Sequence, residues 1–202
     1  MPAASAVGRP KRDDALVVTA GVLLAAGGGT RFVAADHKLR AAAAGRPLVS
    51  YALAALADSG LSALAVVTGA VDIDDLIPGG VAHVSNPAWE RGQATSLAAA
   101  VEWARALGAD AIVVGLGDQP GVTPESWRAV AAATATPIAV ASYGGHRGHP
   151  VRLGRQVWDR LPAEGDAGAR ALIAGSPELV TDVACVGDPS DVDTVEDLTR
   201  WR

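Results

Sequence analysis

Cysteine and aromatic residues are scarce in this chain of 202 residues. The single cysteine, Cys185, has no second cysteine to pair with, so we expect a small core residue in a protein of a reducing compartment. Phenylalanine, tryptophan and tyrosine make up only 4% of the residues, while half of the residues are apolar. The core must therefore be built mainly from alanine, valine and leucine.

Positive charge is also in deficit, because 17 lysine and arginine residues face 22 aspartate and glutamate residues and leave a net charge of −5. This balance argues against nucleic acid as a partner, since binding to nucleic acid depends on clustered basic side chains. An anionic small molecule remains a suitable partner, because a local group of cations can lie on an acidic protein.

Long hydrophobic runs are missing as well. The longest one, residues 15–26, is interrupted by Thr19 and Gly21 and is shorter than the roughly 20 residues that a membrane-spanning helix needs. Residues 1–15 contain no apolar stretch typical of a secretion signal and are predicted to form a disordered tail. We therefore expect a soluble, cytoplasmic protein with no membrane partner, in which residues 16–202 form a single domain.

Hydrophobic periodicity predicts an alternation of strands and helices after the tail. Strand patterns cover residues 16–25, 63–68, 81–85, 110–118, 137–142 and 178–186. Helix patterns cover residues 47–60, 96–107, 124–134, 155–161 and 166–175, and a last helix follows Thr194. Ser96 is expected to cap its helix, and the glycine- and histidine-rich segment 143–154 is expected to form a loose turn. Such alternation is typical of an α/β fold whose mostly parallel sheet carries helices on both faces and binds ligands at the carboxyl ends of its strands.

The stretch "GVLLAAGGGTRF", residues 21–32, places three glycines and then an arginine at the end of a predicted buried strand. It does not match the dinucleotide-binding fingerprint, whose third glycine would fall on Phe32. It does not match the Walker A motif either, because the chain has no Gly-Lys pair. Two interpretations remain. The backbone N–H groups of the loop wrap a phosphate that Arg31 and Lys38 also reach, or the loop is an ordinary turn beside two solvated cations.

Asp118, in "GLGDQPGV", follows another predicted strand at the same edge of the sheet. A carboxylate close to a triphosphate needs a cation between them, and Mg²⁺ is usually held by one or two carboxylates together with substrate phosphates. Asp118 can instead make a local hydrogen bond within its turn. Asp191 and Asp193 are candidates for a second metal ligand, although Asp193 can also cap the last helix. The sequence does not decide between them.

Polar side chains in three other segments are candidates for holding a second anionic substrate. His146, Arg147 and His149 lie in "GGHRGHPV", where a turn with solvated histidines is the alternative. The segment "NPAWERGQATSL" precedes a predicted helix start, a place where backbone N–H groups bind anions. Its polar residues include Asn86, Arg91, Gln93 and Ser96. Asp166 and Arg170 are spaced for an ion pair along a helix, with substrate binding as the alternative.

Taken together, these motifs resemble the nucleotidyltransferases that act on the molybdenum cofactor and on related small molecules. The resemblance extends from about residue 20 to the C-terminus through "LLAAGGGTRF", "HKL", "GRPLVSYAL", "NPAWERGQATSL", "GLGDQP", "GGHRGHPV", "GDAGARALI" and "DVDTVEDL". The LAAG, GDQP, RGHPV and GDxGAR elements are more similar to the cytidylyltransferase branch than to the guanylyltransferase branch, which usually carries GDMP. In three places the chain departs from the family pattern: Val195 replaces the usual proline, Arg40 and the alanines after it make the lysine loop atypical, and His37 is unusual before Lys38.

The resemblance implies a Rossmann-like nucleotidyltransferase domain that joins CMP from CTP to a phosphorylated acceptor, above all molybdopterin, and releases pyrophosphate. It implies Mg²⁺ held by Asp118 and Asp193, and catalytic roles for Arg31, Lys38 and Asp118. The nucleotide is expected to contact Ala25, Ala26, Gly27, Gly28, Gly29, Thr30, Arg31, Lys38, Thr68, Asn86 and Ser96. The acceptor is expected at Gln119, His146, Arg147, His149 and Asp166, and a molybdenum hydroxylase is the candidate recipient of the finished cofactor.

Two other hypotheses stay open at this point. The protein can be a transferase of the same superfamily that uses another nucleotide, or a phosphorylated sugar, polyol or small acid as acceptor. It can also be a non-catalytic protein that carries a finished molybdenum cofactor to its target. A working triphosphate and metal site would separate both transferase hypotheses from the carrier.

Overall fold

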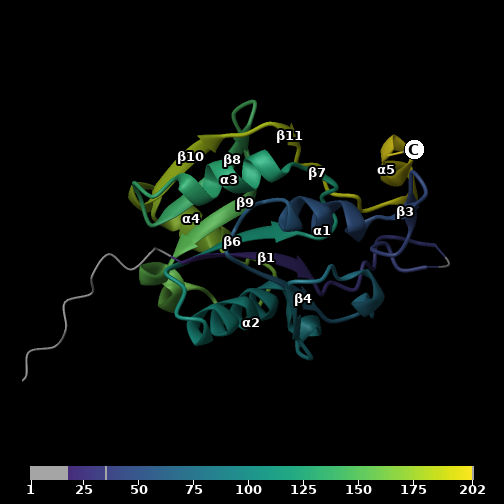
Figure 1. Ribbon diagram of the computed structural model, residues 1–202, viewed down its shortest axis with the longest axis horizontal. Coiled ribbons are helices and arrows are strands. Elements are labelled where there is room, and N and C mark those ends of the chain that lie inside the picture. The colour runs from purple at the N-terminus through teal and green to yellow at the C-terminus, as the bar shows by residue number, and fades with distance from the viewer. Residues whose placement is uncertain (1–17, 35, 202) are drawn as a thin grey trace, which may run out of the picture.

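The structure, a computed structural model, describes residues 18–34 and 36–201, so the predicted tail and the first residues of the first predicted strand lie outside the described part. Its main sheet has seven strands in the order β10-β8-β9-β6-β1-β4-β5 (Figure 1). These strands are β1 (Thr19–Ala25), β4 (Ala63–Thr68), β5 (Val81–Ser85), β6 (Ala111–Leu116), β8 (Ile138–Tyr143), β9 (His146–Gly154) and β10 (Val180–Ala184). All neighbouring strands are parallel except β9, which runs antiparallel to both β6 and β8. The predicted α/β fold with a mostly parallel sheet is confirmed.

Helices cover both faces of the sheet. They are α1 (Val49–Ala57), α2 (Gln93–Ala106), α3 (Pro124–Ala132), α4 (Arg170–Gly175) and α5 (Val195–Leu198), with short 3-10 turns η1 (Asp74–Leu76), η2 (Trp89–Arg91), η3 (Arg155–Arg160), η4 (Pro177–Leu179) and η5 (Thr199–Trp201). Leu97 and Val101 of α2 pack on one face, and Leu53 of α1 and Trp127 of α3 pack on the other. Within the described residues, no helix has the length and apolar character that crossing a membrane requires.

The strand β9 occupies the segment for which the sequence pattern predicts a loose turn, so that prediction is wrong. Only Gly144 and Gly145, both with positive φ, form the turn that joins β8 to β9. The first half of β9 is polar and glycine-rich, which hides its strand character, whereas Val151 and Leu153 in the second half are buried. Backbone pairing with β6 on one side and β8 on the other stabilises a strand that local sequence does not favour.

The helix α2 begins at Gln93 and not at Ser96, so Ser96 does not cap it. Gly92 precedes the helix with φ of 102°, a conformation that glycine adopts without strain. The last helix begins after Thr194 as predicted, and Thr194 caps it, because its hydroxyl accepts from the N–H of Asp197 while the Asp197 carboxylate accepts from the N–H of Thr194. This reciprocal capping box also shows why Val195 can replace proline without loss of the helix start.

The C-terminal segment returns to the carboxyl edge of the sheet. The short strand β11 (Gly187–Asp188) pairs antiparallel with β7 (Gly121–Val122), and the N–H of Val192 donates to the carbonyl of Asp118 at 2.9 Å. Val192 and Leu198 are buried with Phe32 in a cluster that also includes residues around the hairpin of β2 (Ala42–Ala43) and β3 (Arg46–Pro47). Figure 1 shows α5 beside β3 at one end of the molecule. Residues 189–193 are thereby held against the loops that follow β1 and β6.

Candidate active site

The glycine loop and Asp118 follow neighbouring strands. β1 lies between β4 and β6 in the sheet, and Leu24 of β1 is in register with Leu116 of β6. The chain leaves β1 into residues 26–31 and leaves β6 into the turn that carries Asp118. Two cavities open at this edge, and Leu24, Leu116 and Gln93 line both of them.

The first cavity, of about 490 Å³, is formed around the glycine loop. It brings together most of the residues that the resemblance assigns to the nucleotide, namely Ala25, Ala26, Gly27, Gly28, Gly29, Thr30, Arg31, Lys38 and Ser96. Asp118, Asp193 and Asp166 also line it, and Trp89 closes one side. Its lining is therefore a set of backbone N–H groups with cations and carboxylates at one end, which suits a polyphosphate held together with a metal ion.

His37 connects the glycine loop to the lysine loop. Its Nε2 lies 3.1 Å from the carbonyl of Gly27, and its Nδ1 accepts the N–H of Leu39 at 3.2 Å. Because Nδ1 is an acceptor, the ring proton is on Nε2 and is donated to Gly27. Burial lowers the pKa of His37, which favours this neutral form. His37 thus has a structural explanation that the sequence did not provide.

Gly29 shows how closely the two loops pack. Its φ is +61°, and a Cβ at this position would lie 3.1 Å from Cγ of Lys38 and 3.2 Å from Nε2 of His37. A side chain would be strained by the backbone conformation and would also press on Lys38. The glycine is therefore required for the position of Lys38 as well as for the turn.

Lys38 lies between two carboxylates at the mouth of the first cavity. Its Nζ is 2.6 Å from Oδ2 of Asp118 and 3.2 Å from Oδ1 of Asp193. Nη1 of Arg31 lies 3.0 Å from the other oxygen of Asp193. Burial by itself would lower the pKa of Lys38, but Asp118 and Asp193 outweigh it and raise that pKa, so the side chain is an ammonium ion at neutral pH.

The donor set at this point fits a magnesium ion. Two carboxylates that share one ammonium are close enough to share a small hard cation, and carboxylate oxygens are ligands that Mg²⁺ accepts. Across the described ranges, no group of three or more His, Cys, Asp or Glu side chains can hold a metal by itself. The remaining ligands would then be phosphate oxygens and water, as is usual for Mg²⁺ at nucleotide sites.

Asp191 occupies a different position from Asp193. Its Oδ1 accepts from Nε2 of Gln119 at 2.7 Å, and it lines the second cavity. Partial burial of the carboxyl group and the nearby charge of Asp118 raise the pKa of Asp191. Since Asp193 and not Asp191 shares an ammonium with Asp118, Asp193 is the better candidate for the second metal ligand.

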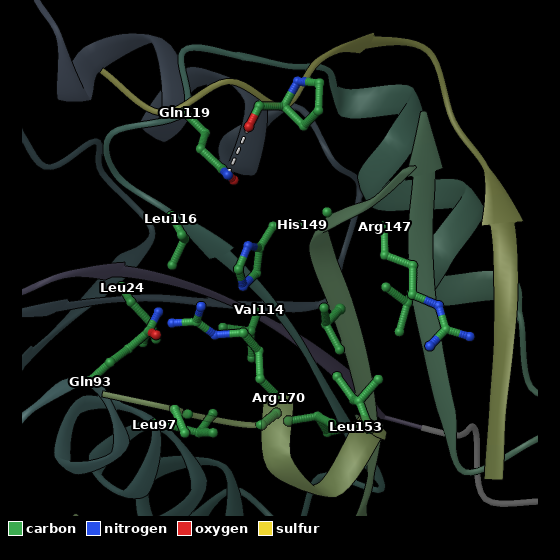
Figure 2. A pocket seen from close by; sticks show the side chains of 18 of the residues that line it. Leu24, Gln93, Leu97, Val114, Leu116, Gln119, Arg147, His149, Leu153 and Arg170 are labelled. Carbon is green, nitrogen blue, oxygen red and sulfur yellow. Dashed lines mark hydrogen bonds between the residues drawn. The ribbon is translucent and has the colours of Figure 1, made fainter. Parts of the chain in front are cut away.

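The second cavity, of about 590 Å³, adjoins the first and is more apolar (Figure 2). Its walls are made mainly by Leu24, Leu97, Val114, Leu116, Val140, Val151, Leu153 and Ile173. Its polar side chains are Gln93, Gln119, Arg147, His149, Arg170 and Asp191. A flat apolar group with a few polar atoms fits such a lining better than a sugar does.

The residues proposed for the acceptor do not all face this cavity. Gln119, Arg147 and His149 line it, whereas Asp166 lines the first cavity and His146 is exposed on the β8–β9 hairpin and lines neither. Burial lowers the pKa of His149 to about 4, so its imidazole is neutral at physiological pH.

Arg147 and Arg170 differ in what they offer a ligand. Arg147 is engaged by Asp182 at 2.7 Å, and Figure 2 shows its guanidinium turned away from the centre of the cavity. Arg170 extends toward Gln93 in the same view and donates to the backbone carbonyl of Asp166 at 3.0 Å. Its charge therefore lies on the side where the two cavities meet. The expected ion pair with Asp166 is replaced by this contact to the backbone.

Two residues expected to bind the nucleotide lie outside the lining of the first cavity. The hydroxyl of Thr68 lies 2.6 Å from Nε2 of His83. The amide of Asn86 donates to Oγ1 of Thr95 and Oγ of Ser96, both at 2.9 Å, and thereby holds the loop before α2. Both side chains thus support the walls of the site in this structure.

Leu24 and Leu116 line both cavities but were not singled out from the sequence as site residues, because apolar residues at the end of a buried strand carry no signal for ligand binding. Gln93, which the sequence placed among the polar candidates for the second substrate, also lines both cavities. Gln93 is the first residue of α2, which begins three residues before the predicted start. The N–H of Ala94 donates to the carbonyl of Gly165 at 2.9 Å, so the beginning of this helix is partly closed by the chain itself.

This sheet topology, with a glycine loop and an opposing carboxylate pair at its carboxyl edge, defines a nucleotidyltransferase domain. The family follows from comparison with known proteins. Residues 21–182 match the MobA-like NTP transferase domain family, and the chain belongs to that family. A nucleoside triphosphate and an acceptor are the substrates that membership of this family implies.

Individual relatives agree with this assignment. The purine catabolism protein PucB of Bacillus subtilis (strain 168) is 31% identical over 124 residues, which are 59% of this chain and 60% of PucB, so the match spans less than two thirds of that protein. The crystal structure of an Rv0371c homologue from Mycobacterium sp. strain JC1 is similar with a TM-score of 0.77 and 29% identity, over 91% of this chain and 94% of that one. Rv0371c of Mycobacterium tuberculosis H37Rv, in a complex with manganese, is similar with a TM-score of 0.71 and 30% identity, over 91% and 97%.

Proposed function

We propose that the protein transfers CMP from CTP to a phosphorylated acceptor, with molybdopterin as that acceptor, and releases pyrophosphate. The observation that carries the proposal is the meeting of two cations and two carboxylates at the glycine-loop cavity, directly beside a second, apolar cavity. The charged groups are Arg31, Lys38, Asp118 and Asp193. The first cavity supplies charge for a triphosphate, and the second supplies room for the acceptor.

The nucleophile in this reaction is an oxygen of the acceptor's own phosphate. A phosphate monoester has a second pKa of about 6 and is largely dianionic at neutral pH. Its oxygen attacks the α-phosphorus in line, one P–O bond forms, and the bond to the pyrophosphate breaks. No serine, cysteine or strong general base is required. The protein must hold two anions together, and positioning and electrostatics supply most of the rate enhancement in such transfers.

Each charged residue has a distinct task in this proposal. The N–H groups of Gly27, Gly28 and Gly29 bind phosphate oxygens, and Arg31 adds its charge from the exposed side of the loop. Lys38 neutralises charge on the pyrophosphate as it leaves. Mg²⁺ held by Asp118 and Asp193 would neutralise the phosphates while they approach the carboxylates.

The choice of CTP and molybdopterin rests on motifs of this chain. LAAG, GDQP, RGHPV and GDxGAR resemble the cytidylyltransferase branch of the family. The apolar lining of the second cavity, which suits a flat ring, is compatible with a pterin. A molybdenum hydroxylase would then be the recipient of the finished cofactor.

Calorimetric titration with CTP, GTP, ATP and UTP in turn, each with Mg²⁺, tests the nucleotide. Selective binding of CTP is expected. A preference for another nucleotide would place the protein with a different transferase of the same superfamily. Failure to bind any nucleotide, also in the presence of the acceptor, would favour the non-catalytic carrier.

Asp118→Asn tests catalysis. We expect turnover to fall by a factor of at least about 100, because the variant lacks one of the two carboxylates that face the transferred charge. Circular dichroism should show an intact fold, since asparagine has nearly the same volume. The matched control is Asp159→Asn, an exposed residue of η3 outside both cavities. Unchanged turnover in Asp118→Asn would refute its assignment as a metal ligand.

A further inference from the structure

The indole of Trp89 lies against two glycines at the first cavity. A Cβ built on Gly28 would lie 2.8 Å from Cζ3 and 3.1 Å from Cη2 of Trp89, and a Cβ on Gly69 would lie 2.8 Å from its Cβ. Neither glycine has a positive φ, so the missing side chains make room for the indole rather than for a turn. The six-membered ring of Trp89 therefore contacts the glycine loop itself.

The backbone around Trp89 is fixed by hydrogen bonds within the protein. The N–H of Ala88 donates to Oδ1 of Asn86 at 3.0 Å, and the carbonyl of Ala88 accepts from Oγ1 of Thr95 at 3.1 Å. Asn86 and Thr95 are both buried. On the other side, the carbonyl of Trp89 accepts from the N–H of Gly92 at 3.1 Å. A ligand that uses the indole therefore does not have to order this segment first.

Trp89 differs from the tryptophans of the core. Trp127 and Trp158 are 1% and 3% exposed and pack among the apolar side chains on the two faces of the sheet. Trp89, in contrast, is half-buried and lines the first cavity. Among the described residues of that lining it is the one aromatic side chain. Part of its surface is thereby available to a ligand, and an aromatic surface favours a flat π-system.

The position of Trp89 on the loop suits the base of a nucleotide. The N–H groups of Gly27, Gly28 and Gly29 are the candidates for binding phosphate, and Trp89 contacts the middle one of these glycines. In a nucleoside triphosphate only the ribose separates the base from the α-phosphate, so a base is within reach of an aromatic ring at this loop. Stacking on aromatic side chains is a common way to bind bases and tolerates all of them, because each base has a π-face.

We propose that the indole of Trp89 is the platform on which the base of the bound nucleoside triphosphate stacks. The proposal rests on the function proposed above in one respect, namely that the first cavity holds a nucleoside triphosphate. It does not depend on the choice of CTP, on the acceptor or on transfer. Trp89 lines the first cavity and not the second, which assigns it to the nucleotide rather than to the acceptor. The indole thus supplies affinity for the base, while the glycine loop and the cations supply affinity for the phosphates.

Comparison of CTP with inorganic tripolyphosphate, which carries no base, tests the platform on the full chain. Both are titrated in the presence of Mg²⁺ by calorimetry. In Trp89→Leu the affinity for CTP should fall by about tenfold, because a stacking contact is lost, while the affinity for tripolyphosphate should stay within about twofold of the wild type. Equal losses for both ligands would overturn the proposal, because Trp89 would then act only through the shape of the loop. An unchanged affinity for CTP would overturn it as well.

Trp89→Phe keeps a smaller aromatic face. It should retain part of the affinity for CTP that Trp89→Leu loses, and a loss as large as that in Trp89→Leu would contradict stacking. The matched control is Trp103→Phe, because Trp103 is half-buried on α2 and lines neither cavity. This control should bind CTP as the wild type does.

Tryptophan fluorescence decides the case in which Trp89→Leu does not fold. CTP should quench the emission of the wild type, because a stacked base lies on one indole, whereas tripolyphosphate should not. Trp89→Phe should lose most of this quenching, and Trp103→Phe should keep it. A wild type that binds CTP without any quenching would speak against the platform.

The outcome is separate from the outcome for the proposed function. Binding of CTP that depends on Trp89, without any CMP transfer, would reject the transferase function and retain the platform. Transfer of CMP together with equal losses for CTP and tripolyphosphate in Trp89→Leu would do the reverse. If another nucleoside triphosphate binds selectively, it replaces CTP in every comparison.

Discussion

Lys38 and Asp118 are 80 residues apart in the sequence, yet Nζ of the lysine lies 2.6 Å from Oδ2 of the aspartate. The same ammonium contacts Asp193 at 3.2 Å. One lysine thus neutralises the two carboxylates that are the candidates for holding a metal ion. A divalent cation that binds both carboxylates must compete with this ammonium, so Lys38 is expected to weaken metal binding until a triphosphate draws it away.

Lys38→Met separates the two roles of this lysine. Without the ammonium, the affinity for Mn²⁺ in the absence of nucleotide should rise by about tenfold, because a competing charge is removed. Turnover with CTP should fall by about 100-fold or more, because charge on the pyrophosphate is no longer neutralised. Electron paramagnetic resonance of free Mn²⁺ measures the first effect. Arg40→Met, which removes a cation paired with Asp75 on the surface, is the control. Weaker Mn²⁺ binding in Lys38→Met would contradict the competition.

Arg31→Ala should weaken CTP binding without unfolding the protein. The Arg31 side chain is 76% exposed and touches Asp193 at 3.0 Å, so its loss has little effect on packing. A charge-assisted contact to phosphate is expected to account for a loss of affinity of about 10- to 100-fold. Calorimetry with CTP and Mg²⁺ measures it, with Arg200→Ala as a control on an exposed side chain. A dissociation constant equal to that of the wild type would remove Arg31 from the nucleotide site.

His37→Ala should loosen the glycine loop. The variant loses the hydrogen bonds to Gly27 and Leu39, which should reduce the free energy of unfolding by about 1–2 kcal/mol and raise the KM for CTP more than it lowers kcat. His37→Gln keeps a donor and an acceptor and should restore part of both losses. Urea unfolding and steady-state kinetics check this. If His37→Gln and His37→Ala behave alike, the connection through the imidazole is not what positions the loop.

Because of His149, the folded protein should lose stability as the pH falls. Burial lowers its pKa in the folded chain from 6.5 to about 4, so the unfolded chain binds a proton more readily. The contribution of the neutral imidazole to stability is complete above about pH 6.5 and is lost progressively as the pH falls from about 6.5 to about 4. Nearby Asp118 opposes this shift and Arg170 adds to it.

His149→Gln should therefore flatten the decline of stability in that pH range. Urea unfolding at several pH values measures the effect. His146→Gln, at an exposed position on the same strand, should leave the decline as it is in the wild type. A wild-type stability that does not change between about pH 6.5 and about pH 4 would show that His149 is not buried in a neutral form.

Local sequence was sufficient for the parts of the fold that depend on neighbours along the chain. The apolar stretch before Ala26 predicts a buried strand, and the three glycines predict a turn at its end. The start of the last helix after Thr194 is likewise a short-range prediction that the structure confirms. The α/β class follows from the alternation of such segments.

Strand β9 and the start of α2 were mispredicted for different reasons. His146, Arg147 and Gly148 have little intrinsic tendency to form a strand, and only pairing with β8 makes them part of one. Gln93 begins a helix because Gly92 and Gly165 pack together before it. Only at the start of α2 is a deciding partner, Gly165, far away in the sequence.

The sequence by itself determined that a strand would end in a glycine loop, that Arg31 and Lys38 would follow it, and that Asp118 would end another strand at the same edge. Only the tertiary structure decided that Asp193 shares Lys38 with Asp118 and that Gln119 donates to Asp191 beside the second cavity. The physical reason is that both arrangements depend on the return of the C-terminal segment, which backbone pairing and burial of apolar residues hold against segments sixty or more residues earlier in the chain.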